Sequence, residues 1–249
     1  MELSRVGFIH YAHILCIDIF KMKTIKKDIA IVLAILLVTI LLSSSVQLLV
    51  TATSPRTSYT ILLDAGHGAR DGGCVGVSGS LEKDLNLEYA LEIKRMLVDA
   101  GVNVVLTRSK DTALYSVFAK NKKMDDMRKR IAIINRTKPD LYMSIHMNST
   151  TYTYRQGAQV YYGQVNQSGK DFADLLASTY NKLLPSASPN STKGDLYILD
   201  KSEYTGVLIE CGFLSNAEEE AMLLTKEYRQ RFAYATFCAV MLYLGLQVV

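Results

Sequence analysis

From residue 59 onward, the sequence predicts an α/β domain with a mostly parallel sheet. Short apolar runs rich in β-branched and aromatic residues alternate there with longer segments of helical periodicity. Gly, Asp or Asn residues bound the short runs, as expected for strands. This alternation is typical of parallel sheets covered by helices, in which sites form at the carboxyl ends of the strands.

The strands are expected to follow one another with helices between most of them. The runs that predict strands are Thr60–Asp64, Asn103–Thr107, Leu141–His146, Ala158–Tyr162 and Val207–Cys211. The first helix is predicted from an apolar arc that Gly101 terminates, formed by Leu87, Ala90, Leu91, Leu97 and Val98. The second helix is predicted from Met124, Met127, Ile131 and Ile134. The last two are Ser168–Leu184 and a segment from about Glu227 to Leu244, with Phe232, Ala235, Ala239 and Leu242 on one side.

The N-terminal part of the chain has a different composition. A basic region, 1–28, precedes an apolar segment, 29–50, that is long enough to cross a bilayer core of about 30 Å. A basic flank before such a segment is typical of a signal peptide or an uncleaved membrane anchor, and it predicts that the rest of the chain lies outside the cytoplasm. Residues 51–58 are expected to be a linker, and residues 59–249 to be the main folded domain.

Composition excludes several classes of protein. With 49% hydrophobic and 21% charged residues, the chain is not intrinsically disordered. The 28 Lys and Arg residues exceed the 24 Asp and Glu residues by too little to indicate a nucleic-acid partner. The four cysteines are widely and irregularly spaced, so they predict neither a disulfide framework nor a CxxC metal site.

Two histidines and two glutamates map to one edge of the expected sheet. His67 directly follows the first strand, and His146 ends the third. Glu82 precedes the first helix, and Glu210 lies near the end of a later strand. Two imidazoles and one carboxylate suit a catalytic Zn²⁺ with an open position, and the other glutamate could transfer protons.

Each of these residues also has a purely structural interpretation. A lone histidine at a strand end is usually a hydrogen-bonding residue, and a glutamate before a helix suits the helix dipole. Glu210 is harder to explain in this way, because an unpaired carboxylate inside an apolar strand is costly. The combination of all four at one edge therefore favours a site.

At this point the sequence resembles a known family. The runs ILLDAGHGARDGG, LEKDLNLEYA, VVLTR, SIHMNS, GAQVYY and LIECGFLSN resemble, in order, the signatures of the zinc-dependent N-acetylmuramoyl-L-alanine amidases of bacterial cell walls, the amidase-3 type. The resemblance implies a mixed, mainly parallel twisted sheet flanked by helices on both faces. It also implies that His67, Glu82 and His146 hold Zn²⁺ and that Glu210 is the catalytic residue.

The family's reaction is hydrolysis of the amide between N-acetylmuramic acid and L-alanine in peptidoglycan, which releases the stem peptide. The predicted N-terminal membrane segment agrees with that extracytoplasmic substrate. A small, N-terminally anchored amidase without added wall-binding modules resembles the sporulation and germination amidases of the spore cortex.

Several further polar or charged residues are expected to support the site. Arg108 is expected to bind a substrate carboxylate or to pair with Asp111, and Asn148 to contact substrate or shape its loop. Asp64 and Asp71 are expected to contact the residues that bind the metal and to hold their orientation. Arg130 and Asn135 match family positions that tie their helix to a loop.

Three alternatives remain open at this point. One is a zinc peptidase or deacylase that cleaves another amide. A second is a non-catalytic, membrane-tethered protein that binds the wall. A third is a thiol hydrolase with Cys74 or Cys211 as nucleophile and His146 as base, although neither cysteine opens a helix that would activate it.

Overall fold

A computed structural model describes residues 33–40 and 59–246 of the chain. The chain divides into two compact units, Met1–Thr57 and Ser58–Val249. In the first unit, residues 33–40 form a helix whose large apolar side chains are exposed. Among the described residues there is no helix with the length and apolar character needed to cross a membrane. The basic region 1–28, the linker 51–58 and most of the segment 29–50 lie outside the described residues.

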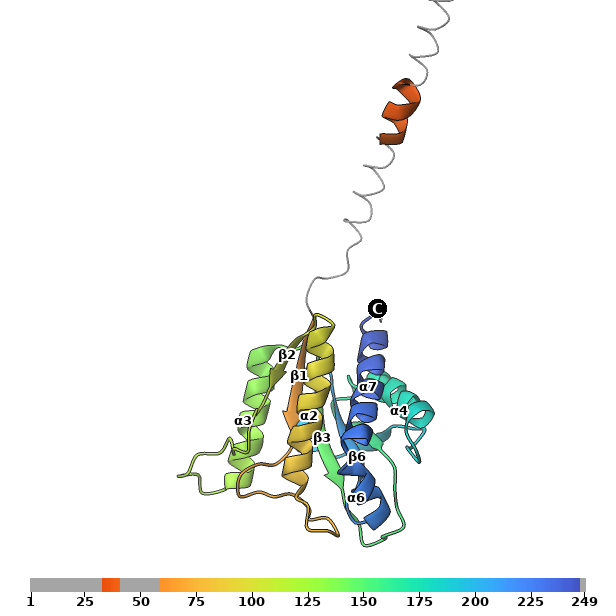
Figure 1. Cartoon of the computed structure of the whole chain (residues 1–249). Helices are drawn as coiled ribbons and strands as arrows, with labels where there is room; N and C mark the ends of the chain where they lie inside the picture. Colours follow the sequence, from red (N-terminus) through yellow and green to blue (C-terminus); the bar gives the residue numbers. More distant parts are fainter. Residues whose placement is uncertain (1–32, 41–58, 247–249) are drawn as a thin grey trace, which may run out of the picture. The chain divides into compact units, whose positions relative to one another are not determined.

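The second unit is built around one mixed sheet (Figure 1). Within residues 59–246 the sheet has six strands, in the order β2-β1-β3-β6-β4-β5. Neighbouring strands run parallel except β4 and β6, which are antiparallel. The predicted mixed, mainly parallel sheet is therefore confirmed. The strands are β1 (Thr60–Ala65), β2 (Asn103–Leu106), β3 (Leu141–Asn148), β4 (Gln159–Gly163), β5 (Thr192–Gly194) and β6 (Gly206–Phe213).

Helices cover both faces of the sheet, as predicted. On one face, Leu63, Met143 and Ile209 belong to the larger apolar core, to which α2 (Glu82–Asp99), α4 (Lys170–Leu183), α6 (Ala217–Leu223) and α7 (Lys226–Tyr243) also contribute. On the other face, Leu62 and Tyr142 belong to a smaller core with α3 (Lys122–Thr137) and α5 (Tyr197–Lys201). The alternation of side chains along a strand produces this division, because successive residues point to opposite faces.

The predicted buried face of α2 was partly wrong, although Ala90 and Leu97 are fully buried as predicted. Leu91 and Val98 are 39% and 47% exposed, whereas Tyr89 and Ile93 are fully buried. The helix is rotated because it must also pack against α7, where the rings of Tyr89 and Phe232 meet edge to face at 5.3 Å. On α7, Phe232 is buried as predicted, but Leu242 is 67% exposed.

The short elements β5, α5 and α6 were not predicted, because three to seven residues are too few to show a periodic pattern. Of these, α6 nevertheless contacts the loop at the edge where the parallel strands end, through Glu220. The loop between β1 and α2 closes on itself there through two isolated β-bridges, Gly68 with Asp71 and Val75 with Leu81. The predicted site residues lie on this loop or at the ends of neighbouring strands.

Candidate active site

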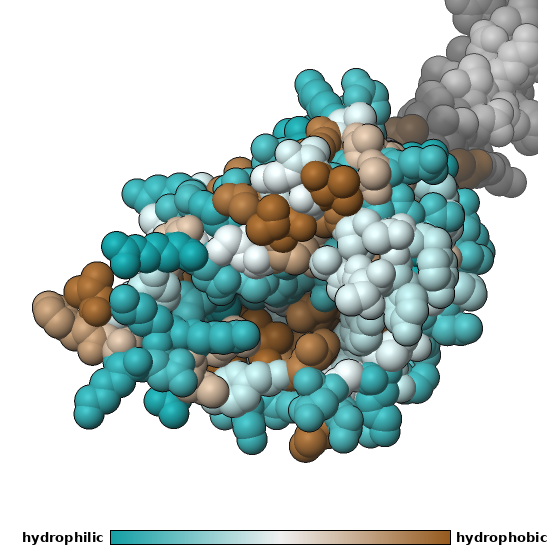
Figure 2. Space-filling view, turned by 90° about the horizontal axis from the view of Figure 1, so that it is seen from below, coloured by the Kyte–Doolittle hydropathy of each residue, from teal (hydrophilic) through white to brown (hydrophobic). Residues whose placement is uncertain are grey.

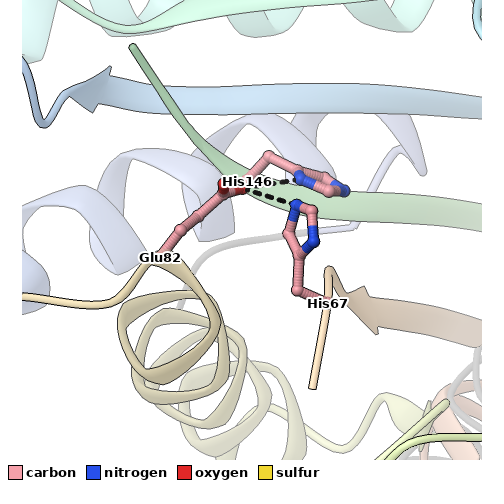
Figure 3. Close-up of side chains that lie close together, drawn as sticks. All are labelled: His67, Glu82 and His146. Carbon is pink, nitrogen blue, oxygen red and sulfur yellow. Dashed lines mark hydrogen bonds and ion pairs between the residues drawn. The ribbon is translucent and has the colours of Figure 1, made fainter. Parts of the chain in front are cut away.

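The three predicted metal ligands meet at the carboxyl end of the sheet (Figure 3). His67 comes from the loop after β1, Glu82 is the first residue of α2, and His146 lies near the end of β3. Glu82 Oε1 lies 2.8 Å from His146 Nδ1 and 3.3 Å from His67 Nε2. One ligand atom from each residue lies within 4.8 Å of those of the other two, so the three side chains can share a single ion.

The close approach of these side chains depends on glycines in the β1–α2 loop. A Cβ atom on Gly66 would lie 2.2 Å from His146 Cε1, and one on Gly73 would lie 2.4 Å from Glu82 Oε2. Gly73 also has a φ of +71°, which side chains disfavour. His67 itself adopts a left-handed φ of 61°, an uncommon conformation for a residue other than glycine. The glycines therefore leave the space that the ligand side chains occupy.

His67 and Glu82 have partners that orient them. His67 Nδ1 lies 2.9 Å from Asp71 Oδ2, and Glu82 Oε2 accepts a hydrogen bond from the Cys74 amide at 2.9 Å. Burial tends to raise the pKa of Glu82, but hydrogen bonds and charge from His146 and His67 outweigh it and hold that pKa far below its usual range. Burial tends to lower the pKa of His67, but Glu82 and Asp71 raise it overall. The predicted supporting contact of Asp71 is thus present.

Glu210 approaches the same edge from β6. It is paired with His146 in the register of the parallel strands β3 and β6. Burial, with a smaller contribution from the charge of Glu82, raises the pKa of Glu210 to about 7. Among the described residues, its Oε2 is buried without a hydrogen-bond partner. A carboxyl group in this state is suited to accept and donate a proton near neutral pH.

Behind the loop, a buried ion pair holds the backbone of the site. Arg130 Nη1 lies 2.5 Å from Asp64 Oδ1 and donates to the Ala65 carbonyl, and its Nη2 donates to the His67 carbonyl. Asp64 also accepts hydrogen bonds from Thr107 and Ser144, and within residues 59–246 no hydrogen bond joins it to His67 or His146. Its support is therefore indirect and acts through Arg130. The expectation that Arg130 ties its helix to a loop is confirmed.

Arg108 lies in a different environment from the one predicted. It is 4% exposed, and its guanidinium donates to the carbonyls of Ala65, Gly66 and Lys83. Asp111 instead accepts hydrogen bonds from Lys83 Nζ and the Ala69 amide. Within residues 59–246, Arg108 forms no direct ion pair with Asp111, so that expected role is corrected, and its buried guanidinium instead stabilises the loop backbone. Its contact with a substrate carboxylate remains a prediction.

Asn148 ends β3 on the predicted side of the site. Its Nδ2 donates to Gln159 Oε1 at 3.0 Å, and its Oδ1 accepts from the Ser149 amide. Gln159 is in turn paired with Glu210 in the register of β4 and β6. These contacts place Asn148 beside the strand that carries Glu210. Its contact with substrate remains a prediction.

A cavity of about 210 Å³ adjoins the cluster on the α3 side of the sheet. His67, His146 and Asp71 form one end of it, and apolar side chains such as Leu208 and Ile198 line its interior. Figure 2 looks onto this end of the sheet and shows a hollow with hydrophobic side chains inside and hydrophilic ones around it. The cavity therefore lies next to His67 and His146.

The two cysteines near the site are poorly suited to nucleophilic attack. Burial raises the pKa of the Cys74 thiol to about 12, and the negative charges of Glu82 and Glu210 contribute to the increase. Burial also raises the pKa of Cys211 well above its usual value. A thiol hydrolase needs a thiolate near neutral pH, so these environments argue against that alternative.

Two supporting residues were missed in the sequence. Glu220 on α6 accepts hydrogen bonds from Ser78 and Ser80 in the β1–α2 loop. Glu219 accepts from the amides of Gly157 and Phe213. Both glutamates follow the N-cap of a short helix, where acidic residues are common, so no local pattern marks them.

Comparison with known proteins agrees with this geometry. Residues 61–241 match the Amidase_3 family, described as N-acetylmuramoyl-L-alanine amidase. The germination-specific N-acetylmuramoyl-L-alanine amidase of Bacillus subtilis (strain 168) is 33% identical over 194 residues, which cover 76% of this chain and 81% of that relative.

Two solved structures have a similar fold. The CwlD amidase from Clostridioides difficile, solved in complex with the GerS lipoprotein, has a TM-score of 0.71 and 30% identity over 75% of this chain and 98% of that one. The catalytic domain of the amidase CwlV from Bacillus (Paenibacillus) polymyxa has a TM-score of 0.68 and 30% identity over 76% of this chain and 99% of that one. The chain therefore belongs to the Amidase_3 family, the N-acetylmuramoyl-L-alanine amidases.

Proposed function

We propose that the chain hydrolyses the amide between N-acetylmuramic acid and L-alanine in bacterial peptidoglycan. In this proposal His67, Glu82 and His146 hold Zn²⁺, and Glu210 is the general base and then the general acid. The observation that carries the proposal is the buried Glu210 carboxyl, whose Oε2 has no partner among the described residues, next to a group of three ligands.

The chemistry of the ligands supports zinc. Two imidazoles and one carboxylate are a common ligand set of catalytic zinc sites, which keep one position open. Asp71 contacts Nδ1 of His67, as carboxylates commonly do with the second nitrogen of a metal-bound histidine. Zn²⁺ bound there would polarise the scissile carbonyl and increase the acidity of the attacking water.

Glu210 supplies the proton transfers in this mechanism. Its ionised carboxylate takes a proton from the water that attacks the lactyl carbonyl. The protonated carboxyl then donates that proton to the departing nitrogen of L-alanine, so the products are a free lactyl carboxylate and a stem peptide with a free amine. A pKa near 7 suits both steps, because neither protonation state is strongly disfavoured.

The direct test is digestion of purified peptidoglycan by the full chain, followed by mass spectrometry of the products. We expect stem peptides that begin with L-alanine, loss of activity in a metal chelator and recovery with Zn²⁺. The Glu210→Gln variant should retain zinc and lose at least about 100-fold in rate. New termini inside the peptide would instead indicate a peptidase. Binding to the wall by the zinc-loaded chain without cleavage would indicate a non-catalytic wall-binding protein.

The site of action is proposed to be extracytoplasmic, with the segment 29–50 as signal peptide or anchor. The physical basis is its apolar composition and basic flank. Two reporter enzymes fused after residue 249 test this, one active only outside the cytoplasm and one active only inside it. We expect activity from the first reporter and none from the second.

A role in spore cortex maturation is proposed from the similarity to the germination-specific relative. Removal of this chain from its source bacterium should then deplete muramic lactam in the cortex while leaving vegetative wall composition unchanged. Normal muramic lactam would reject the cortex role and leave the amidase proposal in place.

A further inference from the structure

A second cavity, of about 340 Å³, opens beside the metal-ligand cluster. It shares His67, Asp71, Lys123 and Asp126 with the cavity described above, so the two hollows adjoin each other at His67. The second cavity differs in character, because its further lining residues include the cationic side chains of Arg70 and Lys122 and the ring of Tyr115.

The cations of this cavity form no close ion pair with a carboxylate in the described part of the chain, although the charge of Lys123 interacts with that of Asp71 at longer range. Lys122 Nζ lies 5.7 Å from the centre of the Tyr115 ring, which holds the ammonium group over an aromatic face. Arg70, Lys122 and Lys123 are exposed, and none of them forms an ion pair or a side-chain hydrogen bond within residues 59–246. Three positive groups are thus available to an external ligand.

The carboxylates in the same cavity are already occupied. Asp126 accepts hydrogen bonds from Arg130 Nε and from the Leu114 amide. Asp71 faces His67 and accepts from the Gly73 amide. Because these internal donors satisfy both acids, the cavity as a whole favours a negatively charged ligand.

The positions of the lysines are unfavourable for the helix that carries them. Lys122 and Lys123 are the first two residues of α3, where the helix dipole is positive and cations are destabilising. An anion bound between them would benefit from both side chains and from the dipole. The arrangement therefore points to ligand binding and not to helix stability.

We propose that this cationic cavity, lined by Arg70, Lys122 and Lys123, binds the carboxylate that the second residue of the stem peptide carries. The inference rests on the proposed function and deepens it by assigning the cavity to the peptide side of the scissile bond. Where the second residue of a stem peptide is not amidated, its free carboxylate lies next to L-alanine and hence close to the scissile bond. The glycan side of the bond is uncharged, so only the peptide side matches the cavity.

The test compares two soluble muramoyl peptides that differ only in whether the second residue carries a carboxylate or a carboxamide. The Lys122→Gln/Lys123→Gln double variant should raise KM for the carboxylate substrate roughly five- to tenfold. Its kcat should change little, and KM for the carboxamide substrate should stay within about twofold. The Lys122→Arg/Lys123→Arg variant should keep the parent's lower KM for the carboxylate substrate, because it keeps both positive charges.

Lys129→Gln is the matched control, since Lys129 lies on the same helix, pairs with Asp125 and lines neither cavity. It should leave both substrates unaffected. An equal loss for the two substrates, or a loss in the control of the same size, would overturn the proposal.

A binding measurement separates this inference from the proposed function. The dipeptide L-Ala-D-Glu, added to the zinc-loaded Glu210→Gln variant, should bind, and the added lysine substitutions should weaken that binding by a similar factor. If the parent cleaves neither muramoyl peptide but the dipeptide binds in a lysine-dependent way, the proposed reaction fails and the anion site stands. If the parent cleaves the muramoyl peptides but the lysine substitutions do not change dipeptide binding, the proposed reaction stands and the anion site fails.

Discussion

His67 Nδ1 lies 2.9 Å from Asp71 Oδ2, so the loop that presents the imidazole also carries the carboxylate that orients it. With Nδ1 engaged, Nε2 is the nitrogen that faces Glu82, at 3.3 Å. The left-handed backbone of His67 and the Gly68–Asp71 bridge fold the loop back so that both side chains of this pair meet. The orientation of the His67 imidazole therefore depends on a residue four positions away.

Replacement of Asp71 with alanine should weaken zinc binding by about 10- to 100-fold, because the histidine loses the partner that sets its orientation and basicity. Competition with a chromophoric zinc chelator measures the affinity. Asp99→Ala is the control, since Asp99 is exposed and, within the part of the chain that the structure describes, pairs with Arg95 alone on the surface of α2. Unchanged zinc affinity in the Asp71 variant would remove this residue from the site.

Gly66→Ala should disable the site. The new Cβ would lie 2.2 Å from His146 Cε1, so the imidazole must move and the shared ion must lose a ligand. We expect a loss of about 1–3 kcal/mol in stability, measured by urea unfolding, together with loss of bound zinc. Gly72→Ala in the same loop meets only Leu81 Cδ2, at 3.6 Å, and should behave like the parent. Equal behaviour of the two variants would contradict the packing argument.

Glu210→Gln should increase the free energy of unfolding of the metal-free protein at neutral and alkaline pH, but not at acidic pH. The pKa of Glu210 is about 7 when folded, above the usual 4.5 of an exposed glutamate, so the folded state holds its proton longer than the unfolded state. As pH rises from about 4.5 to 7, the parent therefore loses stability that the uncharged glutamine retains. The variant should exceed the parent by about 1–3 kcal/mol at pH 8 and match it at pH 4.

Urea unfolding of both proteins in the presence of a chelator, over that pH range, measures the difference. All other titrating groups are common to the two proteins, so their contributions cancel. A stability difference that does not change with pH would mean that Glu210 is not buried as an ionisable group.

Cys74→Ala should retain most of the activity, within about threefold of the parent, because a thiol with a pKa near 12 supplies almost no thiolate at neutral pH. Iodoacetamide should likewise fail to inactivate the zinc-loaded enzyme at pH 7. Rates of stem-peptide release before and after treatment measure the effect. Activity that survives a chelator but disappears in Cys74→Ala would establish the thiol mechanism instead.

Much of the fold follows from local patterns. The strands β1, β3 and β6 are short, largely apolar runs, and their boundaries differ from prediction by one or two residues. The approach of His67, Glu82 and His146 was also predictable, since parallel strands end at the same edge of a sheet. Glu210 was recognisable as a carboxylate within an otherwise apolar strand.

The partners of the charged side chains were decided by the tertiary structure. Arg108 was expected to face Asp111 or a substrate, but it lies among main-chain carbonyls, and Lys83 contacts Asp111. Arg130 pairs with Asp64, which is 66 residues away in the sequence. Local sequence sets the period and the ends of an element, whereas ion pairs between distant segments depend on how the elements pack. For the same reason, the buried face of α2 became known only once α7 was in place against it.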